Sequence, residues 1–179
     1  GGFASIVLDI EDNPIVLYYN WLANESLELA YWKNNSWIFD EIDSQLGNLG
    51  GHSSAIYDTE GILHVSYFDH SDNSLIYAAW DGYAWDFSTV ATDLGEYGGW
   101  DSIALDSLSI PYISYFNDNT KSINYTCLSN GYWSSYEVIR DIGNYPGNSS
   151  IAVDNLGIVH IAFFSPDRGT LNLFSTEPE

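Results

Sequence analysis

Residues 53–99 read SSAIYDTEGILHVSYFDHSDNSLIYAAWDGYAWDFSTVATDLGEYGG, and this stretch decides the fold because the rest of the chain repeats it. Its opening pattern, Ser-x-x-x-Asp, occurs four times in the 179 residues, at spacings of 49, 48 and 48. The copies are Ser5 to Asp9, Ser54 to Asp58, Ser102 to Asp106 and Ser150 to Asp154. Self-similarity at a fixed period of roughly 20 to 50 residues indicates a repeat architecture. The chain is therefore built from copies of one unit.

Each copy predicts a series of short strands. The first, SSAIYD in the second copy, is rich in Ser and Ala, which suits a crowded position where several sheets meet at an axis. The second is apolar on both faces in every copy (PIVLYY, LHVSYF, PYISYF and VHIAFF), so it has to be covered by a sheet on each side. Asp81-Gly82 and Asn130-Gly131 separate the third and fourth strands, and these dipeptides are strong hairpin signals.

Four-stranded antiparallel units of roughly 40 to 50 residues, packed face to face, are the blades of β-propellers. The sequence predicts an all-β β-propeller with blades over residues 1–49, 50–97 and 98–145 and a partial blade over 146–179. The fourth copy stops after its third strand, and an uncovered edge strand invites pairing with another chain. We expect either a segment of a longer propeller of about six to eight blades, or a homo-oligomer whose chains complete one another.

The composition is strongly acidic, with 25 Asp plus Glu against 4 Lys plus Arg and a net charge of -21. Such a surface repels phosphate backbones, so nucleic acid is not an expected partner. Hydrophobic residues make up 45%, and the sequence has no apolar run of about 18 residues, so a soluble chain without membrane insertion is expected. The chain contains no Met and begins Gly1-Gly2, which predicts a processed or excised N-terminus. An extracellular or cell-surface location is expected.

The succession Ser-x-Ala-x-Asp, a turn, His-x-Ser-Tyr-Phe-Asp, and Leu-x-Tyr-Ala-x-Trp-Asp-Gly-x-x-Trp covers nearly the whole chain in its four variants. It resembles the sialidase-like propeller repeats of BNR or Asp-box type that are common in extracellular bacterial and archaeal proteins. The hairpin from Trp80 to Trp85 is also similar to repeats of small propeller lectins. An Asp-box proper reads Ser-x-Asp-x-Gly-x-Thr-Trp, and here only the turn and the Trp are kept. The fold implied by the resemblance hosts enzymes, lectins and structural modules.

Catalysis is not expected. Sialidases, as the resemblance implies, hold the substrate carboxylate with three arginines, whereas this chain has only Arg140 and Arg168. A general glycosidase needs two carboxylates about 5 to 10 Å apart, which 25 acidic residues would supply by chance. An inactive fragment of a larger glycoside hydrolase remains one of the alternatives.

Aromatic residues are the candidates for ligand binding, because flat rings beside Asp and Asn suit stacking on sugars. Those that recur in register, Trp37, Trp85 and Trp133, are interpreted as packing between blades. The candidates for contact with a glycan or protein ligand are Trp21, Trp80, Tyr83, Trp100 and Tyr132.

Acidic loops offer one candidate calcium site. The loop after the second strand varies most between copies, and Asp69, Asp72 and Asn73 there offer oxygen atoms of the kind that Ca²⁺ accepts. The alternative is a solvated turn made of good turn-formers. The Asp-x-x-Gly link at Asp58 and Asp154 is likewise interpreted as a turn.

The expected function is a non-catalytic extracellular propeller module that binds glycan or protein ligands. The alternative is a structural or assembly subunit, in an oligomer or filament, completed by strand or blade exchange between chains.

Overall fold

The computed structural model describes residues 2–20, 22, 25–43, 49–143 and 148–177. These residues form strands and turns and contain no helix, hence none that could span a membrane. The strands are β1 (Gly2–Leu8), β2 (Pro14–Asn20), β3 (Ser26–Lys33), β4 (Ser36–Asp43), β5 (Leu49–Tyr57), β6 (Leu63–Asp69), β7 (Ser74–Trp80), β8 (Trp85–Ala91), β9 (Gly99–Leu105), β10 (Pro111–Asn117), β11 (Ser122–Ser129), β12 (Tyr132–Ile139), β13 (Ser149–Val153), β14 (Val159–Ser165) and β15 (Thr170–Ser175).

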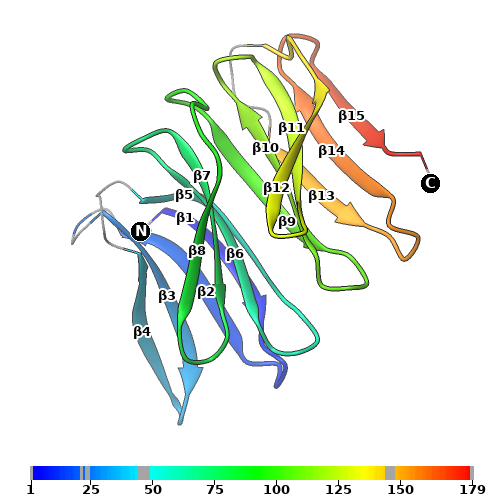
Figure 1. Cartoon of the computed structure of the whole chain (residues 1–179). Helices are drawn as coiled ribbons and strands as arrows, with labels where there is room; N and C mark the ends of the chain where they lie inside the picture. Colours follow the sequence, from blue (N-terminus) through cyan, green and yellow to red (C-terminus); the bar gives the residue numbers. More distant parts are fainter. Residues whose placement is uncertain (1, 21, 23–24, 44–48, 144–147, 178–179) are drawn as a thin grey trace.

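The strands form three four-stranded sheets and one three-stranded sheet, and in each sheet the order in space follows the order in the chain. All pairings are antiparallel. The four sheets stand side by side in an open arc from the first, in blue, to the last, in red (Figure 1). The first strands of neighbouring sheets, β1, β5, β9 and β13, contact one another in sequence and so line the inside of the arc. The prediction of successive antiparallel blades, the last with three described strands, is confirmed.

The core lies between the sheets rather than inside any one of them. All seven residues of β6 are buried, as predicted for a strand covered on both sides. Val65 and Tyr67 pack with Leu17 of the first sheet, whereas Phe68 belongs to the cluster shared with Ile113 of the third sheet. Alternate residues of one strand therefore contact opposite neighbours, as the side-chain period of two requires.

The repeated Asp shapes the turn between the first two strands of each sheet. Oδ1 of Asp58 accepts hydrogen bonds from the backbone N–H of Glu60 at 2.9 Å and of Ile62 at 2.8 Å. Equivalent pairs of bonds form at Asp9, Asp106 and Asp154. The interpretation of this carboxylate as a turn-former is confirmed.

Candidate functional site

Equivalent hydrogen bonds join the inner strands β5 to β9 and β9 to β13. The backbone N–H of Ile103 donates to Oγ of Ser54 at 3.3 Å, and the N–H of Ile151 donates to Oγ of Ser102 at 3.4 Å. The Ser of the repeated Ser-x-x-x-Asp thus reaches the next sheet, and a larger side chain at this position would push the strands apart. This explains the small residues expected near the axis.

Each of the first three inner strands contains a bulge near its start, where the pairing register shifts. Phe3, His52 and Trp100 lie in these bulges with φ of 53°, 60° and 53°. A left-handed backbone costs a bulky residue on the order of 1–3 kcal/mol, and bulges redirect side chains. The three bulges place three rings, one from each copy, at the same end of the inner surface.

Gly99 makes the third bulge possible. Its φ is +89°, and a Cβ atom there would lie 2.7 Å from Cβ of Phe68. Phe68 is fully buried, so it has no room to retreat. Gly is therefore required immediately before Trp100, both for its backbone conformation and for the close approach.

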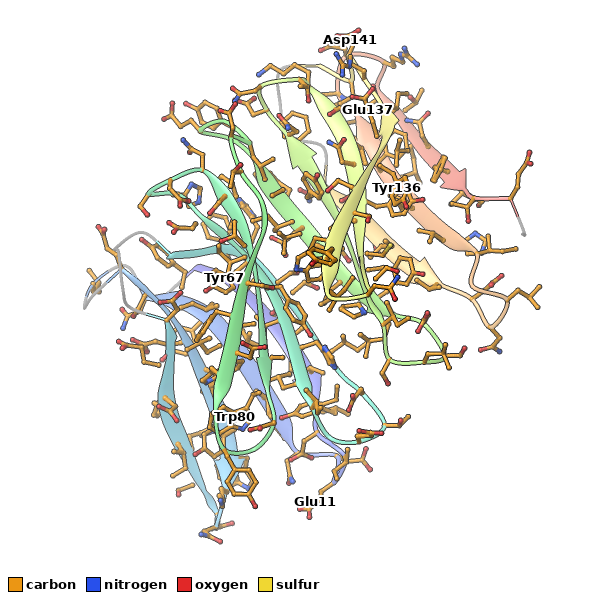
Figure 2. The ribbon with its side chains drawn as sticks, in the orientation of Figure 1. Glu11, Tyr67, Trp80, Tyr136, Glu137 and Asp141 are labelled. Atoms are coloured by element: carbon orange, nitrogen blue, oxygen red, sulfur yellow. The ribbon has the colours of Figure 1, made fainter. Side chains whose placement is uncertain are left out.

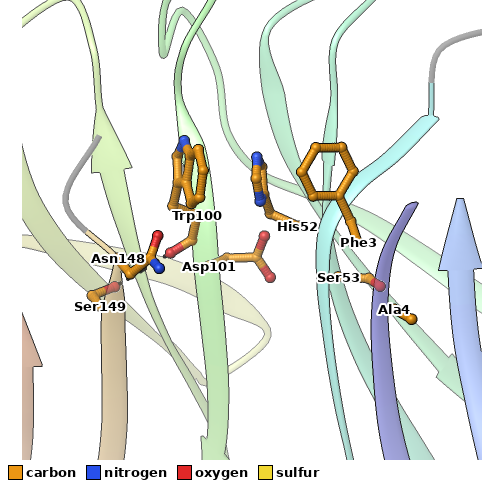
Figure 3. A pocket seen from close by; sticks show the side chains of 8 residues that line it. All are labelled: Phe3, Ala4, His52, Ser53, Trp100, Asp101, Asn148 and Ser149. Carbon is orange, nitrogen blue, oxygen red and sulfur yellow. Dashed lines mark hydrogen bonds between the residues drawn. The ribbon is translucent and has the colours of Figure 1, made fainter. Parts of the chain in front are cut away.

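The three rings form a ladder across the inner strands (Figure 3). The centroids of Phe3 and His52 are 4.2 Å apart at an interplanar angle of 58°, and those of His52 and Trp100 are 3.6 Å apart at 27°. His52 is thus stacked on the indole of Trp100 and tilted against the phenyl ring of Phe3. The ladder presents a largely apolar wall.

This wall borders a pocket of about 270 Å³, which we call the axial pocket (Figure 3). Its lining comes from two equivalent positions in all four copies: Phe3 and Ala4, His52 and Ser53, Trp100 and Asp101, and Asn148 and Ser149. The pocket therefore exists only because four segments that lie far apart in the chain meet on the inner surface.

Asp101 is the acidic residue of the axial pocket. Asp101 is only 9% exposed, and its Oδ2 accepts a hydrogen bond from the hydroxyl of Ser66. Its Oδ1 has no hydrogen-bond partner. Burial raises the pKa of Asp101 to about 7, although the bond from Ser66 acts in the opposite direction. A buried acceptor without a donor costs free energy, and a donor from a ligand in the pocket would recover that cost.

Two further groups set the polarity of the pocket. Oγ of Ser53 is buried and also has no hydrogen-bond partner. Burial lowers the pKa of His52 to about 4, with a smaller contribution from His70, so the imidazole is neutral at pH 7. No Lys or Arg is among the residues that line the pocket. The pocket combines apolar rings with unpaired oxygen atoms and offers no positive charge.

Among the sequence-predicted ligand residues, Trp100 alone of those described lines this pocket. Tyr83 and Tyr132 lie at the outer hairpins, 92% and 77% exposed. Trp80 lies at the far end of β7 (Figure 2), with its ring centroid 5.3 Å from that of Trp85. Trp21 is outside the described residues. The structure does not bring these candidates together, and binding at the hairpins stays a prediction.

Sequence reasoning missed Phe3, His52, Ser53 and Asp101. A signal for Asp101 was nevertheless present: when the copies are aligned on the repeated Ser, its position holds Ala4, Ser53 and Ser149 in the other copies. A carboxylate at a place otherwise reserved for small residues points to a special role.

The predicted calcium ligands act as turn-formers. Oδ1 of Asp69 accepts bonds from the backbone N–H and the hydroxyl of Ser71 at 2.8 and 2.6 Å, and Oδ1 of Asp72 accepts from the hydroxyl of Ser74. Asn73 has a φ of 58°. No group of three or more His, Cys, Asp or Glu side chains within the described part of the chain is placed to hold a metal ion. Calcium binding here stays a prediction.

A second arrangement looks catalytic but is explained by packing. His160 lies 2.8 Å from Oγ of Ser175 through Nδ1 and 3.4 Å from Asp154 through Nε2. In the second sheet His64 makes the same pair of contacts, with Tyr77 at 2.6 Å and Asp58 at 3.4 Å, and there the ring is 6% exposed. Because the same network is buried in the core of the second sheet, we interpret it as structural. In both sheets the His side chain links the second strand to the Asp of the turn that precedes that strand.

No protein-family model matches this chain. No curated protein matches it either. Solved structures do. A fucose lectin from Kordia zhangzhouensis in complex with methyl-fucoside matches 77% of this chain and 99% of its own, at 17% identity and a TM-score of 0.53. The Aleuria aurantia lectin, a six-bladed β-propeller, matches 91% of this chain, at 14% identity and a TM-score of 0.65.

These likenesses, together with the arc of antiparallel sheets, decide the fold. The chain is an arc of a β-propeller. It spans about half the length of the Aleuria lectin, of which 52% is covered. A Hadza microbial sialidase also matches 97% of this propeller arc, at 11% identity and a TM-score of 0.63. Propellers with this fold thus include lectins as well as an enzyme.

The arginines of this propeller lie away from the axial pocket. Arg140 is paired with Glu137 at 2.7 Å on the outer strand β12 and its following turn, and both side chains are largely exposed. Arg168 lies in the turn between β14 and β15, where its backbone N–H donates to the carbonyl of Ser165. Neither arginine lines the pocket.

Proposed function

We propose that this chain is a non-catalytic, extracellular β-propeller module that binds a glycan in the axial pocket. The observation that carries the proposal is the ring ladder of Phe3, His52 and Trp100 beside the unpaired oxygen atoms of Ser53 and Asp101. A pyranose has an apolar face and a belt of hydroxyl groups. Rings beside a few convergent acceptors suit both parts of such a ligand.

The chemistry of the pocket favours binding over hydrolysis. Its lining includes one carboxylate, that of Asp101, whereas glycoside hydrolysis usually uses a pair. The fold alone does not discriminate, because similar propellers include fucose lectins and a sialidase. The non-catalytic assignment therefore rests on the residues of the pocket.

Calorimetric titration with methyl glycosides of neutral monosaccharides tests the proposal. We expect binding by the native chain and a loss of about ten-fold in Trp100→Ala, since stacking on an aromatic ring contributes on the order of 0.5–1.5 kcal/mol beyond the burial of apolar area. Trp100→Phe keeps a ring and should retain part of the affinity. Tyr83→Ala is the matched control, because Tyr83 is an exposed aromatic residue on an outer hairpin.

Two results would contradict the proposal. If no glycan in a broad panel binds the native chain, glycan binding is wrong. If Tyr83→Ala weakens binding and Trp100→Ala leaves it unchanged, the site lies at the outer hairpins and not in the axial pocket. Hydrolysis of an aryl glycoside panel by the native chain would overturn the non-catalytic assignment.

A second candidate function, assembly with a second copy of the chain, is favoured by the two end faces of the arc. On the first sheet Ile6 and Leu8 are 68% and 52% exposed. Their equivalents in the second sheet, Ala55 and Tyr57, pack against the core shared with the first sheet. The same residue positions are thus covered inside the arc and open at its first face.

The last sheet shows the complementary face. Phe164, Leu171 and Leu173 are 45%, 77% and 72% exposed. Their equivalents in the second sheet, Phe68, Leu75 and Tyr77, are buried in the core shared with the third sheet. We propose that the last face of one copy packs on the first face of another, which would repeat the contact already present between neighbouring sheets.

Light scattering across a concentration series tests this assembly. We expect a closed oligomer or longer particles from the native chain, and dissociation in Leu173→Asp because the substitution places a charge on the open face. Tyr83→Asp adds the same charge at an exposed aromatic residue on an outer hairpin and should leave the assembly intact. A monomer at every concentration would mean that some other blade or partner covers these faces, and would overturn the assembly proposal.

A further inference from the structure

The axial pocket holds one buried carboxylate and no cation, and this imbalance points to the charge of the ligand. Asp101 and His52 are the ionisable residues of its lining. The imidazole of His52 is neutral at pH 7, because burial lowers its pKa to about 4. The whole chain adds a net charge of -21. The electrostatic potential in the pocket therefore favours cationic groups and disfavours anionic ones.

We propose that the axial pocket takes an amino sugar with a free, protonated amine, and that this ammonium group binds Oδ1 of Asp101. The inference rests on the proposed function, in which the same pocket binds a glycan. It adds the chemical class of that glycan.

The geometry of Asp101 supports an ammonium partner. One carboxylate oxygen is held by the hydroxyl of Ser66, and the other is buried with no donor. A ligand hydroxyl would bring a neutral donor to this oxygen, whereas an ammonium group brings a charged donor and adds the Coulomb attraction between opposite charges to the hydrogen bond. Burial raises the pKa of Asp101 to about 7, so its carboxyl is partly protonated at neutral pH. An ammonium partner favours the ionised form because it compensates the buried negative charge, which a hydroxyl does not.

The rings next to Asp101 fit the same group. The indole of Trp100, which adjoins Asp101 in β9, lines the pocket together with Phe3. The faces of aromatic rings attract cations through their quadrupole. His52, stacked on Trp100, is neutral and adds no repulsion. The hydroxyl of Ser53 is a further unpaired group within the lining, able to meet a sugar hydroxyl.

The size of the pocket limits how much ligand it encloses. Its volume of about 270 Å³ lies near the lower end of the range of about 300–1,000 Å³ for small-molecule sites. One sugar residue fits this volume better than an extended chain does. Sugars with carboxylate or sulfate groups meet an unpaired carboxylate and no cation, so we expect them to be rejected.

Calorimetric titration of the 179-residue chain at neutral pH with four methyl glycosides tests this inference: those of glucosamine, N-acetylglucosamine, glucose and glucuronic acid. We expect glucosamine to bind about ten-fold more tightly than N-acetylglucosamine, and glucuronic acid to bind most weakly. Asp101→Asn should remove the preference for the amine and leave the affinity for glucose within about two-fold. Glu60→Gln removes the same charge from an exposed turn at the other end of β5 and should change neither affinity.

Folding and the source of the amine are controlled separately. If Asp101→Asn fails to fold, Asp101→Ser replaces it, because Ser stands at the equivalent position in two other copies. An amide of lysine serves as an amine without a sugar ring. If it binds as tightly as the amino sugar, the ligand is a protein amine and the assignment to an amino sugar is overturned.

The outcomes separate this inference from the proposed function. If the neutral glycosides bind but glucosamine shows no preference, or if Asp101→Asn keeps that preference, the amine inference is wrong and glycan binding stands. If neither the amino sugar nor the neutral sugars bind, the proposed function fails.

Discussion

The indole of Trp133 in β12 crosses a blade boundary to contact Tyr77 in β7, with ring centroids 5.1 Å apart at an interplanar angle of 64°. Its Nε1–H donates to Oγ of Ser88 at 3.0 Å. At the equivalent position of the first sheet, Trp37 is 43% exposed, and its ring centroid lies 5.4 Å from that of Trp32 in the same sheet. The same residue in the same repeat position is therefore part of an interface in one blade and part of the open face in another.

This difference predicts unequal effects of two matched substitutions. Trp133→Ala should lower the free energy of unfolding by about 2–4 kcal/mol, because it empties an interface between blades and removes a hydrogen bond. Trp37→Ala should cost about 1 kcal/mol or less, since much of its side chain is already in water. Urea denaturation followed by fluorescence measures both. Equal losses would contradict the role given to the blade boundary.

Asp101→Asn should stabilise the chain at alkaline pH. The pKa of Asp101 is raised from 3.8 to about 7 in the folded state, so folding favours its protonated form. This contribution is complete below pH 3.8 and is lost as the pH rises through about 7. We expect the free energy of unfolding of Asp101→Asn to exceed that of the native chain by roughly 1–3 kcal/mol at about pH 8 and to match it near pH 4.

The pH profile of unfolding by urea checks this prediction. Glu60→Gln, which removes a charge from an exposed turn, should follow the native profile at a constant offset. A difference between Asp101→Asn and the native chain that does not change between about pH 4 and pH 8 would show that Asp101 ionises as easily as in water.

Gly99→Ala should destabilise the chain more than Gly131→Ala. Both residues have positive φ, +89° and +80°, but an added Cβ at Gly99 lies 2.7 Å from Phe68 whereas none of the described atoms lies within 4 Å of one at Gly131. We expect a loss of about 2–4 kcal/mol at Gly99 and about 1 kcal/mol at Gly131, where backbone strain acts alone. Thermal unfolding measures the contrast, and similar shifts in Tm would refute the steric argument.

Salt should stabilise this acidic chain, and calcium serves to test the loop after β6. With a net charge of -21, screening by sodium chloride lowers self-repulsion and should raise Tm. Calcium chloride at the same ionic strength raises Tm further only if an ion binds. The predicted site at Asp69, Asp72 and Asn73 requires that Asp72→Asn abolish this additional rise, and a rise that survives the substitution would place the ion elsewhere.

Much of the fold could be predicted from the sequence because each blade forms from residues that are close together in the chain. The doubly apolar run at residues 63–68 predicted a strand between two sheets, and β6 is buried throughout. Asp81-Gly82 predicted the hairpin between β7 and β8, and the recurring Trp133 predicted packing between blades. These signals work because side-chain periodicity and turn chemistry act within a few residues.

The axial pocket could not be predicted from the sequence in the same way. Its lining residues are separated by about one repeat each, and the position of Phe3, His52 and Trp100 holds a different ring in each of three copies and Asn148 in the fourth. Their common feature is a left-handed backbone at a bulge, with φ between 53° and 60°. Only Trp100 was singled out, as an aromatic residue outside the repeat pattern.

The order of residues along the chain by itself determined the repeat, the strands, the turns and the surfaces that pack between blades, since each follows from contacts within one copy or from its period. The tertiary structure alone decided which differences between copies matter. Closing the inner strands side by side buries Asp101 beside three rings and leaves its Oδ1 without a donor. The physical reason is that burial depends on neighbours from other copies, which no single copy specifies.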